Sequence, residues 1–215
     1  MVVERVEIPK KAIYRLSIYQ RCLSKLCENG KQTVSSSALA AAAGVKSAQL
    51  RKDLAYFGQF GTRGLGYAVE ELRDGIREVL GREQLQPVVL VGVGNLGRAL
   101  LRYRGFEKEG FEVLAAFDAV PEAVVKRGIT VPIHDLDDIA TFIGKSEVKL
   151  AILCVPAEAA QEVANEVVAS GVQGILNFSP AVLLVPEAVT VNNVDLALEL
   201  ENLSYFVSRG GKGDS

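Results

Sequence analysis

A glycine-rich motif in the middle of the chain has the spacing that binds a dinucleotide. It directly follows the apolar run of residues 88–91, which is typical of a buried strand, and it opens a segment with helical periodicity. In that context the first glycine makes a tight turn, the second lets a pyrophosphate approach the backbone, and the third allows close packing of helix on strand. The amino terminus of the helix adds N–H groups and partial positive charge. The predicted cofactor-binding loop consists of Gly92, Val93, Gly94, Asn95, Leu96 and Gly97.

An acidic residue at the end of the next expected strand fits the same ligand. Asp118 stands 21 residues after Gly97. A carboxylate at this position can accept hydrogen bonds from an adenosine ribose and would repel a 2′-phosphate. We therefore expect NADH and NAD⁺ as ligands rather than their phosphorylated counterparts. The alternative is a glycine loop that serves packing alone.

Few side chains could exchange the proton that accompanies hydride transfer. His134 is the single histidine, and its position just before an expected helix at residues 135–143 indicates a surface or capping role. No tyrosine is followed four positions later by lysine, the pairing used by short-chain dehydrogenases. Glu158, Glu162 and Glu166 recur at helical spacing and fit a solvated face better than a metal site. The sequence therefore predicts no catalytic residues, no metal and no enzyme.

Charge is distributed unevenly along the chain. Residues 1–67 hold eleven Lys and Arg against four Asp and Glu, a balance of +7. The whole chain has 24 basic and 26 acidic side chains, so residues 68–215 hold thirteen against twenty-two, a balance of −9. A basic amino-terminal segment on an acidic body indicates an anionic partner, most commonly a nucleic acid. The alternative is a solvated basic face without a partner.

The basic segment has the pattern of a helix-turn-helix. A first helix begins near Pro9 and ends at Gly30. An alanine-rich helix over residues 38–43, preceded by serines that can cap it, is separated by a glycine from a helix that Ser47 can cap and that runs to about Phe57. Small alanines allow the two helices to approach closely. The last helix presents polar and basic side chains to solvent.

Glycines at short intervals over residues 58–67 exclude helix and favour a tight hairpin, the wing of a winged helix. We expect Arg51 and Lys52 to enter the major groove and Gln49 to read a base. Arg63 on the wing would reach phosphates or the minor groove. A two-fold dimer would then bind an inverted repeat. The expected DNA-binding residues are Lys46, Ser47, Gln49, Arg51, Lys52, Thr62, Arg63 and Gly64.

Beyond a polar boundary near residue 84, buried strand patterns alternate with helical patterns, which predicts an α/β fold with a Rossmann-type, doubly wound parallel sheet. Strands are expected at residues 88–91, 113–117, 150–155, 175–178 and 190–194, and helices at 96–103, 122–127, 136–143, 157–169 and 196–208. The predicted domains are a winged-helix domain at residues 1–84, an NAD(H)-binding domain at 85–194, and a carboxy-terminal helix and tail at 195–215.

Composition agrees with a globular protein of the cytoplasm. Apolar residues make up 49% and charged residues 23% of the 215 residues, and the net charge is −2. No apolar run approaches the roughly 18 residues needed to span a bilayer, and the first residues do not have the pattern of a signal peptide. Cys22, Cys27 and Cys154 form no CxxC pair, which predicts neither a disulfide nor a metal framework.

The combination of motifs closely resembles the Rex family of redox-sensing transcriptional repressors. The most specific match is the run from Leu50 to Tyr67, which covers the expected recognition helix and wing. The resemblance extends over nearly the whole chain and also rests on Ile8-Pro9, the glycine motif, Tyr103-Arg-Gly-Phe106, Asn177-Phe-Ser-Pro180 and Asn192-Asn-Val-Asp195.

The resemblance implies a homodimer that binds operator DNA when NADH is scarce and releases it when NADH accumulates. It also implies that the last helix is swapped between protomers, that Tyr103 lies near the nicotinamide, and that Arg21 pairs with Asp195 in one dimer state. Leu196 stands where some relatives have phenylalanine, so the nicotinamide pocket can differ here. An NAD-dependent dehydrogenase and a nucleotide-binding domain of the acyl-CoA synthetase type are the alternatives.

Overall fold

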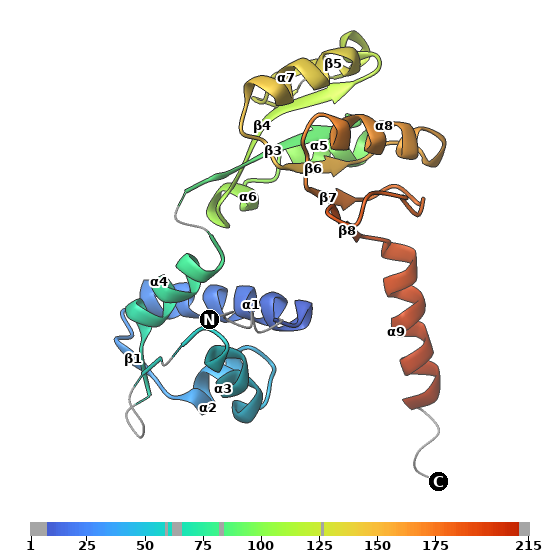
Figure 1. The fold of residues 1–215 in the computed structure, drawn as a ribbon. Coiled ribbons are helices and arrows are strands. Elements are labelled where there is room, and N and C mark those ends of the chain that lie inside the picture. Colours follow the sequence, from blue (N-terminus) through green and yellow to red (C-terminus); the bar gives the residue numbers. More distant parts are fainter. Residues whose placement is uncertain (1–7, 59, 62–65, 82–83, 126, 211–215) are drawn as a thin grey trace, which may run out of the picture. The chain divides into compact units, whose positions relative to one another are not determined.

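The computed structural model describes residues 8–58, 60–61, 66–81, 84–125 and 127–210. The chain divides into two compact units, residues 1–84 and residues 85–215 (Figure 1). No helix in the described parts of the chain is long and apolar enough to cross a membrane.

The described residues of the amino-terminal unit form four helices and a two-stranded ribbon. Its helices are α1 (Lys10–Glu28), α2 (Ser36–Ala42), α3 (Ser47–Ala55) and α4 (Val69–Val79), and the antiparallel strands are β1 (Thr33–Val34) and β2 (Tyr67–Ala68). The Ser35 hydroxyl accepts a hydrogen bond of 3.1 Å from the backbone N–H of Ala38 and caps α2. Ser47 does not cap α3, because the helix begins one residue earlier than expected and Lys46 takes the capping position without a side-chain hydrogen bond.

The core of this unit is built around α1. Leu16, Tyr19 and Leu23 recur every three or four residues on one face of the helix and are fully buried. Leu50 and Leu54 of α3 pack into the same cluster, as does the apolar face of α4. Burial of these side chains fixes how α3 lies against α1, and it leaves the opposite face of α3 exposed.

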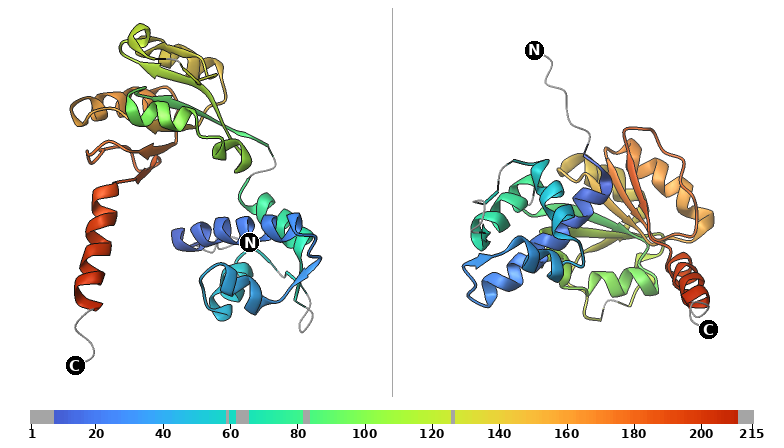
Figure 2. Two further views of the ribbon diagram at one scale, coloured as in Figure 1. Left: turned by 180° about the vertical axis from the view of Figure 1, so that it is seen from behind. Right: turned by 90° about the horizontal axis from the view of Figure 1, so that it is seen from below.

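The second unit contains a six-stranded parallel sheet, which confirms the predicted fold class (Figures 1 and 2). The strands are β3 (Gln86–Val91), β4 (Phe111–Asp118), β5 (Ile133–Asp135), β6 (Leu150–Leu153), β7 (Gly174–Asn177) and β8 (Thr190–Asn193). Their order is β5-β4-β3-β6-β7-β8, so the chain reverses its direction of winding between β3 and β6. Ligands of doubly wound sheets bind at the carboxyl ends of the strands at such a switch point.

Helices cover both faces of this sheet. They are α5 (Asn95–Leu101), α6 (Gly105–Lys108), α7 (Ile139–Lys145) and α8 (Ala157–Ala169), with short 3-10 turns η1 (Pro121–Ala123) and η2 (Leu136–Asp138). Helix α9 (Leu196–Gly210) follows β8 and belongs to neither core. The core on one face includes Phe117, Ile139 and Val163, and the core on the other includes Leu90 and Leu101.

The second unit differs from the local expectations in two respects. The helix expected at residues 122–127 is absent from the described residues of that segment, where only turn η1 forms. A helix of six residues gains too few hydrogen bonds to offset the cost of nucleation. The sequence pattern also missed β5 and α6, which have three and four residues and are too short to show a period. Helix α9 is present, and its large apolar side chains are exposed, Leu203 at 61% and Phe206 at 70%.

Candidate functional site

The glycine motif forms the turn between β3 and α5 at the switch point of the sheet. Gly92 has φ of 92°, a conformation that favours glycine, and its N–H donates to the carbonyl of Phe117 at 2.8 Å. A Cβ on Gly92 would lie 2.6 Å from the carbonyl oxygen of Cys154 on the neighbouring strand. A Cβ on Gly97 would lie 2.0 Å from the carbonyl oxygen of Gly92. Packing of the loop therefore requires glycine at both positions.

Packing places no such demand on the middle glycine. Gly94 has φ of −69°, which any residue can adopt, and a Cβ there would meet no atom within 4 Å. Gly94 lies at the amino terminus of α5, which has no side-chain cap, so the first N–H groups of the helix stay available to an anionic ligand. Open space beside bare backbone fits the pyrophosphate of a dinucleotide.

Asp118 lies beside this loop at the end of β4. One carboxylate oxygen accepts from the N–H of Val93 at 2.7 Å, and the other accepts from the N–H of Val120 at 3.0 Å. The carboxylate thus holds the glycine loop against the second strand of the sheet. Each oxygen has a further lone pair, so Asp118 can also accept from a ribose hydroxyl. Its negative charge opposes a 2′-phosphate at the same place.

The structure separates Tyr103 from the glycine loop. Tyr103 follows the carboxyl end of α5, whereas Gly94 precedes its amino end, and seven helical residues span about 10 Å. The Tyr103 ring is 59% exposed and contacts Phe106 edge-on at 5.2 Å between centroids. It lines a pocket of about 420 Å³ together with Phe111 at the start of β4. Tyr103 is therefore not part of the glycine loop, and its contact with the nicotinamide stays a prediction.

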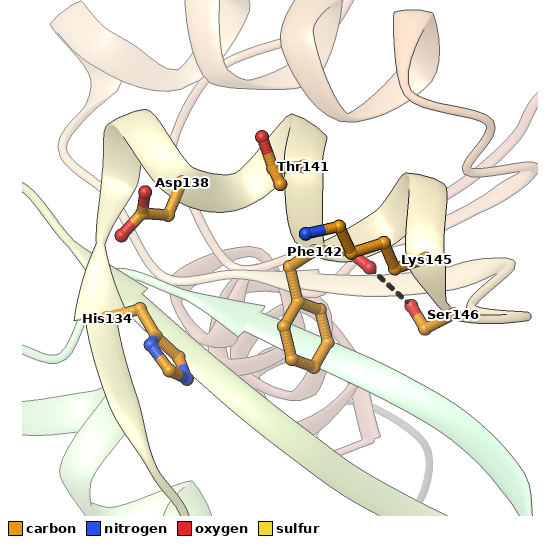
Figure 3. Close-up of a pocket in the computed structure, with 6 residues that line it drawn as sticks. All are labelled: His134, Asp138, Thr141, Phe142, Lys145 and Ser146. Atoms are coloured by element: carbon orange, nitrogen blue, oxygen red, sulfur yellow. Dashed lines mark hydrogen bonds between the residues drawn. The ribbon is translucent and has the colours of Figure 1, made fainter.

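His134 has surroundings that the sequence did not predict. It lies just before turn η2, as expected, but within edge strand β5, its ring is half-buried, and Asp135 takes the capping position. The ring packs near Phe117 and Phe142, with centroid distances of 5.7 and 5.8 Å. A pocket of about 350 Å³ beside it is lined by side chains of α7, among them Thr141 and Lys145 (Figure 3). The single histidine thus belongs to the edge of the sheet and not to the glycine loop.

Helix α3 presents a basic face in the amino-terminal unit. Lys46, Arg51 and Lys52 are exposed, and the Arg51 guanidinium donates to the hydroxyl of Ser36 at 3.3 Å. Ser47 is half-exposed in the first turn of the helix. This arrangement brings five of the eight expected DNA-binding residues, Gln49 included, onto one short helix and the residue that precedes it. Thr62, Arg63 and Gly64 of the expected wing lie outside the described residues.

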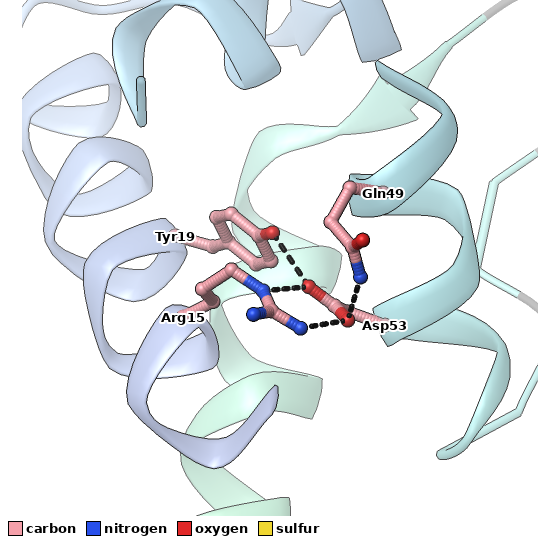
Figure 4. A network of polar contacts seen from close by, with 4 residues as sticks. All are labelled: Arg15, Tyr19, Gln49 and Asp53. Atoms are coloured by element: carbon pink, nitrogen blue, oxygen red, sulfur yellow. Dashed lines mark hydrogen bonds and ion pairs between the residues drawn. The ribbon is translucent and has the colours of Figure 1, made fainter. Parts of the chain in front are cut away.

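A polar network that the sequence reasoning missed joins α3 to α1 (Figure 4). Asp53 is fully buried and accepts hydrogen bonds from Arg15 at 2.6 and 2.7 Å, from Tyr19 at 2.8 Å and from Gln49 at 2.8 Å. Burial alone would raise the pKa of Asp53, but the hydrogen bonds from these three side chains outweigh it and hold the pKa below the usual range. The one sign of this network in the sequence is that Asp53 is an acidic residue within an otherwise basic helix.

The two residues expected to couple the sites belong to different units. Arg21 is exposed on α1 of the amino-terminal unit. Asp195 precedes α9 and caps it, because its carboxylate accepts from the N–H of Ala197 at 2.9 Å and of Leu198 at 3.2 Å. Because the two residues lie in different units, their pairing stays a prediction.

Known protein families match both units of the chain. The family model described as "CoA binding domain" matches residues 83–181, and the model described as "Putative DNA-binding protein N-terminus" matches residues 7–55. The redox-sensing transcriptional repressor Rex of Pelotomaculum thermopropionicum is 44% identical over 203 residues, which cover 94% of this chain and 95% of the relative.

Solved structures agree with the sequence relatives over nearly the same length. RSP, a Rex-family repressor, has been solved in complex with β-NAD⁺ and operator DNA; that structure matches with a TM-score of 0.85 at 34% identity and covers 97% of this chain and 100% of RSP. RSP in complex with β-NADH matches with a TM-score of 0.84 at 33% identity, over 96% of this chain and 97% of RSP. With 44% identity to a curated Rex over 94% of its length, the chain belongs to the Rex family of redox-sensing transcriptional repressors.

Proposed function

We propose that a homodimer of this chain binds an inverted-repeat operator in the cytoplasm and releases it when NADH binds. The observation that carries the proposal is the presence, in one chain, of an exposed basic helix in a helix-turn-helix unit and an open glycine loop at the switch point of a parallel sheet. The relative RSP has been solved with operator DNA and β-NAD⁺ in one structure and with β-NADH in another, which supports this direction of the response.

The cofactor would bind along the carboxyl edge of the sheet. The open space at Gly94 and the uncapped start of α5 support binding of the pyrophosphate, and Asp118 supports binding of the adenosine ribose. The loop residues assigned to this role are Gly92, Val93, Gly94, Asn95, Leu96 and Gly97. An apolar pocket for the nicotinamide would disfavour NAD⁺, because its ring carries a positive charge that loses hydration on burial. Tyr103 is assigned to this pocket by family resemblance alone.

The protein would respond to NADH without converting it. The sequence motifs indicate no proton-transfer residue, and His134 packs among aromatic rings at the edge of the sheet. Discrimination between the two redox forms by charge requires no chemical step. A turnover assay with alcohols and hydroxy acids tests this part of the proposal, and reduction of NAD⁺ above background would contradict it.

DNA would be held by the basic face of α3 and by the wing. Arg51 and Lys52 are exposed on that face, and a recognition helix places its amino-terminal residues at base edges in the major groove. Arg63, with Thr62 and Gly64, would contact phosphates or the minor groove.

The carboxy-terminal helix supports a homodimer. Apolar side chains of α9 are exposed along its length, Leu200 at 66% and Val207 at 76% among them. Large apolar groups in such numbers mark an interaction surface. We propose that α9 is swapped between protomers, as the family resemblance implies. In one dimer state Arg21 would pair with Asp195 of the partner protomer, and a contact that exists in only one state can couple the two sites.

One titration tests the proposal as a whole. An inverted-repeat promoter fragment is bound by the protein in a gel shift, and NADH or NAD⁺ is added. We expect NADH to release the fragment at concentrations at which NAD⁺ does not. Equal release by both, or binding that neither ligand changes, would contradict the proposal.

The coupling pair has its own test. In Arg21→Ala and Asp195→Asn, NADH binding should persist while its power to release DNA changes. Asparagine keeps the cap of α9 and removes only the charge, so the fold of that helix is not at issue. For each variant, operator affinity is measured with and without saturating NADH. If the ratio of the two affinities equals that of the parent in both variants, Arg21 and Asp195 form at most a surface ion pair of ~0 to 1 kcal/mol and do not couple the sites.

A further inference from the structure

A buried carboxylate lies inside the helix that faces DNA in the proposed function. Asp53 is 0% exposed, yet it sits only one residue beyond the exposed Lys52 of α3. Arg15 reaches it from α1 with two hydrogen bonds, and Tyr19 adds a third. These three bonds cross 38 and 34 positions of sequence and fix α3 against α1 (Figure 4).

The fourth hydrogen bond to this carboxylate comes from the exposed side of the helix. The amide nitrogen Nε2 of Gln49 donates to Oδ1 of Asp53 at 2.8 Å. An ionised carboxylate accepts hydrogen bonds and has none to donate, so the amide of Gln49 must turn its NH₂ group toward Asp53. Arg15 keeps Asp53 ionised by lowering its pKa. The carbonyl oxygen Oε1 of Gln49 is consequently the atom that points away from Asp53, as Figure 4 shows.

Gln49 stands where base reading takes place in a helix-turn-helix. It is the third residue of α3 and is half-exposed, on the flank between the buried Leu50 and Leu54 and the exposed Lys52. The amino-terminal residues of a recognition helix contact base edges. In the major groove, adenine and cytosine present an exocyclic amino group that donates, whereas guanine and thymine present acceptors. The orientation of one amide therefore decides which bases Gln49 can read.

We propose that Asp53 is a positioning residue that holds Gln49 with its carbonyl oxygen toward the groove, so that Gln49 selects a base with an exocyclic amino group. The inference rests on the proposed function, since it requires that α3 enters the major groove. It assigns to Asp53 a role in base preference in addition to its role in stability.

Selection from DNA with randomised half-sites tests the inference. The full-length parent, Gln49→Ala, Gln49→Glu and Asp53→Asn are each used to enrich sequences, and the base preference at every position is counted. We expect Gln49→Ala to lose preference for adenine or cytosine at one position of each half-site by roughly tenfold or more. Gln49→Glu should keep that preferred base, because a carboxyl group presents an acceptor outward whether or not it is protonated.

Asp53→Asn should weaken the preference at the same position and leave the others unchanged, because asparagine can accept or donate and so permits both orientations of the Gln49 amide. Tyr19→Phe is the matched control. It removes one hydrogen bond to Asp53 without touching the bond to Gln49, so its base preference should equal that of the parent even where its melting temperature falls.

Three results would overturn the inference. They are an unchanged preference in Gln49→Ala, a move of the preferred base to guanine or thymine in Gln49→Glu, and a parent-like preference in folded Asp53→Asn. Should Asp53→Asn fail to fold, Gln49→Glu still tests whether an acceptor faces the base, because that substitution lies on the helix flank. Failure of the proposed function would look different, since the parent itself would then enrich no sequence.

Discussion

Substitution of Gly94 separates what the glycine loop does for the fold from what it does for the ligand. In Gly94→Val the backbone conformation is compatible with valine, and the new Cβ meets no protein atom within 4 Å. The expected loss of folding free energy is therefore limited to the poorer helix cap, about 1 kcal/mol. Thermal melting should give a transition close to that of the parent.

The loss of NADH binding should be much larger. A branched side chain would fill the space through which the pyrophosphate approaches the backbone. Hydrogen bonds to a charged group contribute about 1.5–3 kcal/mol each. Loss of two such bonds amounts to ~3–6 kcal/mol, or a hundredfold or more in dissociation constant. Calorimetric titration with NADH measures this directly.

Gly97→Val is the matched control for that experiment. A Cβ at Gly97 would lie 2.0 Å from a backbone oxygen, so the strand and helix must separate, at a cost of about 1–3 kcal/mol or more. We expect a lower melting temperature for Gly97→Val and a parent-like one for Gly94→Val. The reasoning is refuted if Gly94→Val binds NADH within threefold of the parent, or if it melts as early as Gly97→Val.

Asp118→Ala should weaken NADH more than NADPH, since it removes both a ribose acceptor and a charge that repels the 2′-phosphate; equal losses in fluorescence titrations with the two ligands would contradict this. Arg51→Ala and Lys52→Ala should each weaken operator binding in gel shifts while NADH binding persists, and a parent-like operator affinity in both would exclude their contacts in the major groove. The pKa of Asp53 is lower in the folded state than in the unfolded chain, so its contribution to stability is present above about pH 4 and is lost as the pH falls through the folded value. Urea unfolding of Asp53→Asn between pH 3 and 7 should consequently depend less on acid than that of the parent, and identical curves would argue against it. Desolvation raises the pKa of the half-buried Cys154 thiol to about 12, so iodoacetamide at pH 8 should modify it far more slowly in the native than in the unfolded protein, and equal rates by mass spectrometry would count against the raised pKa.

The glycine motif and the alternation of strands and helices were readable because both are local. A glycine turn after a buried strand has the same backbone requirements in any doubly wound sheet, so spacing alone indicates the nucleotide loop. The same holds for the serine cap of α2 and the apolar stripe of α1. Local pattern was insufficient where elements are short, and it produced a helix at residues 122–127 that the described residues do not form.

Contacts between distant residues could not be obtained in this way. The orientation of Gln49 depends on Asp53, and the charge of Asp53 depends on Arg15, 38 positions away on another helix. The bond from Val93 to Asp118 likewise forms only when β3 and β4 lie side by side. The types and spacing of residues therefore determine which ligands this chain can hold. Tertiary packing decides which atom of a side chain faces the ligand. A group that already makes a hydrogen bond inside the fold, such as the amide nitrogen of Gln49, is turned away from the ligand.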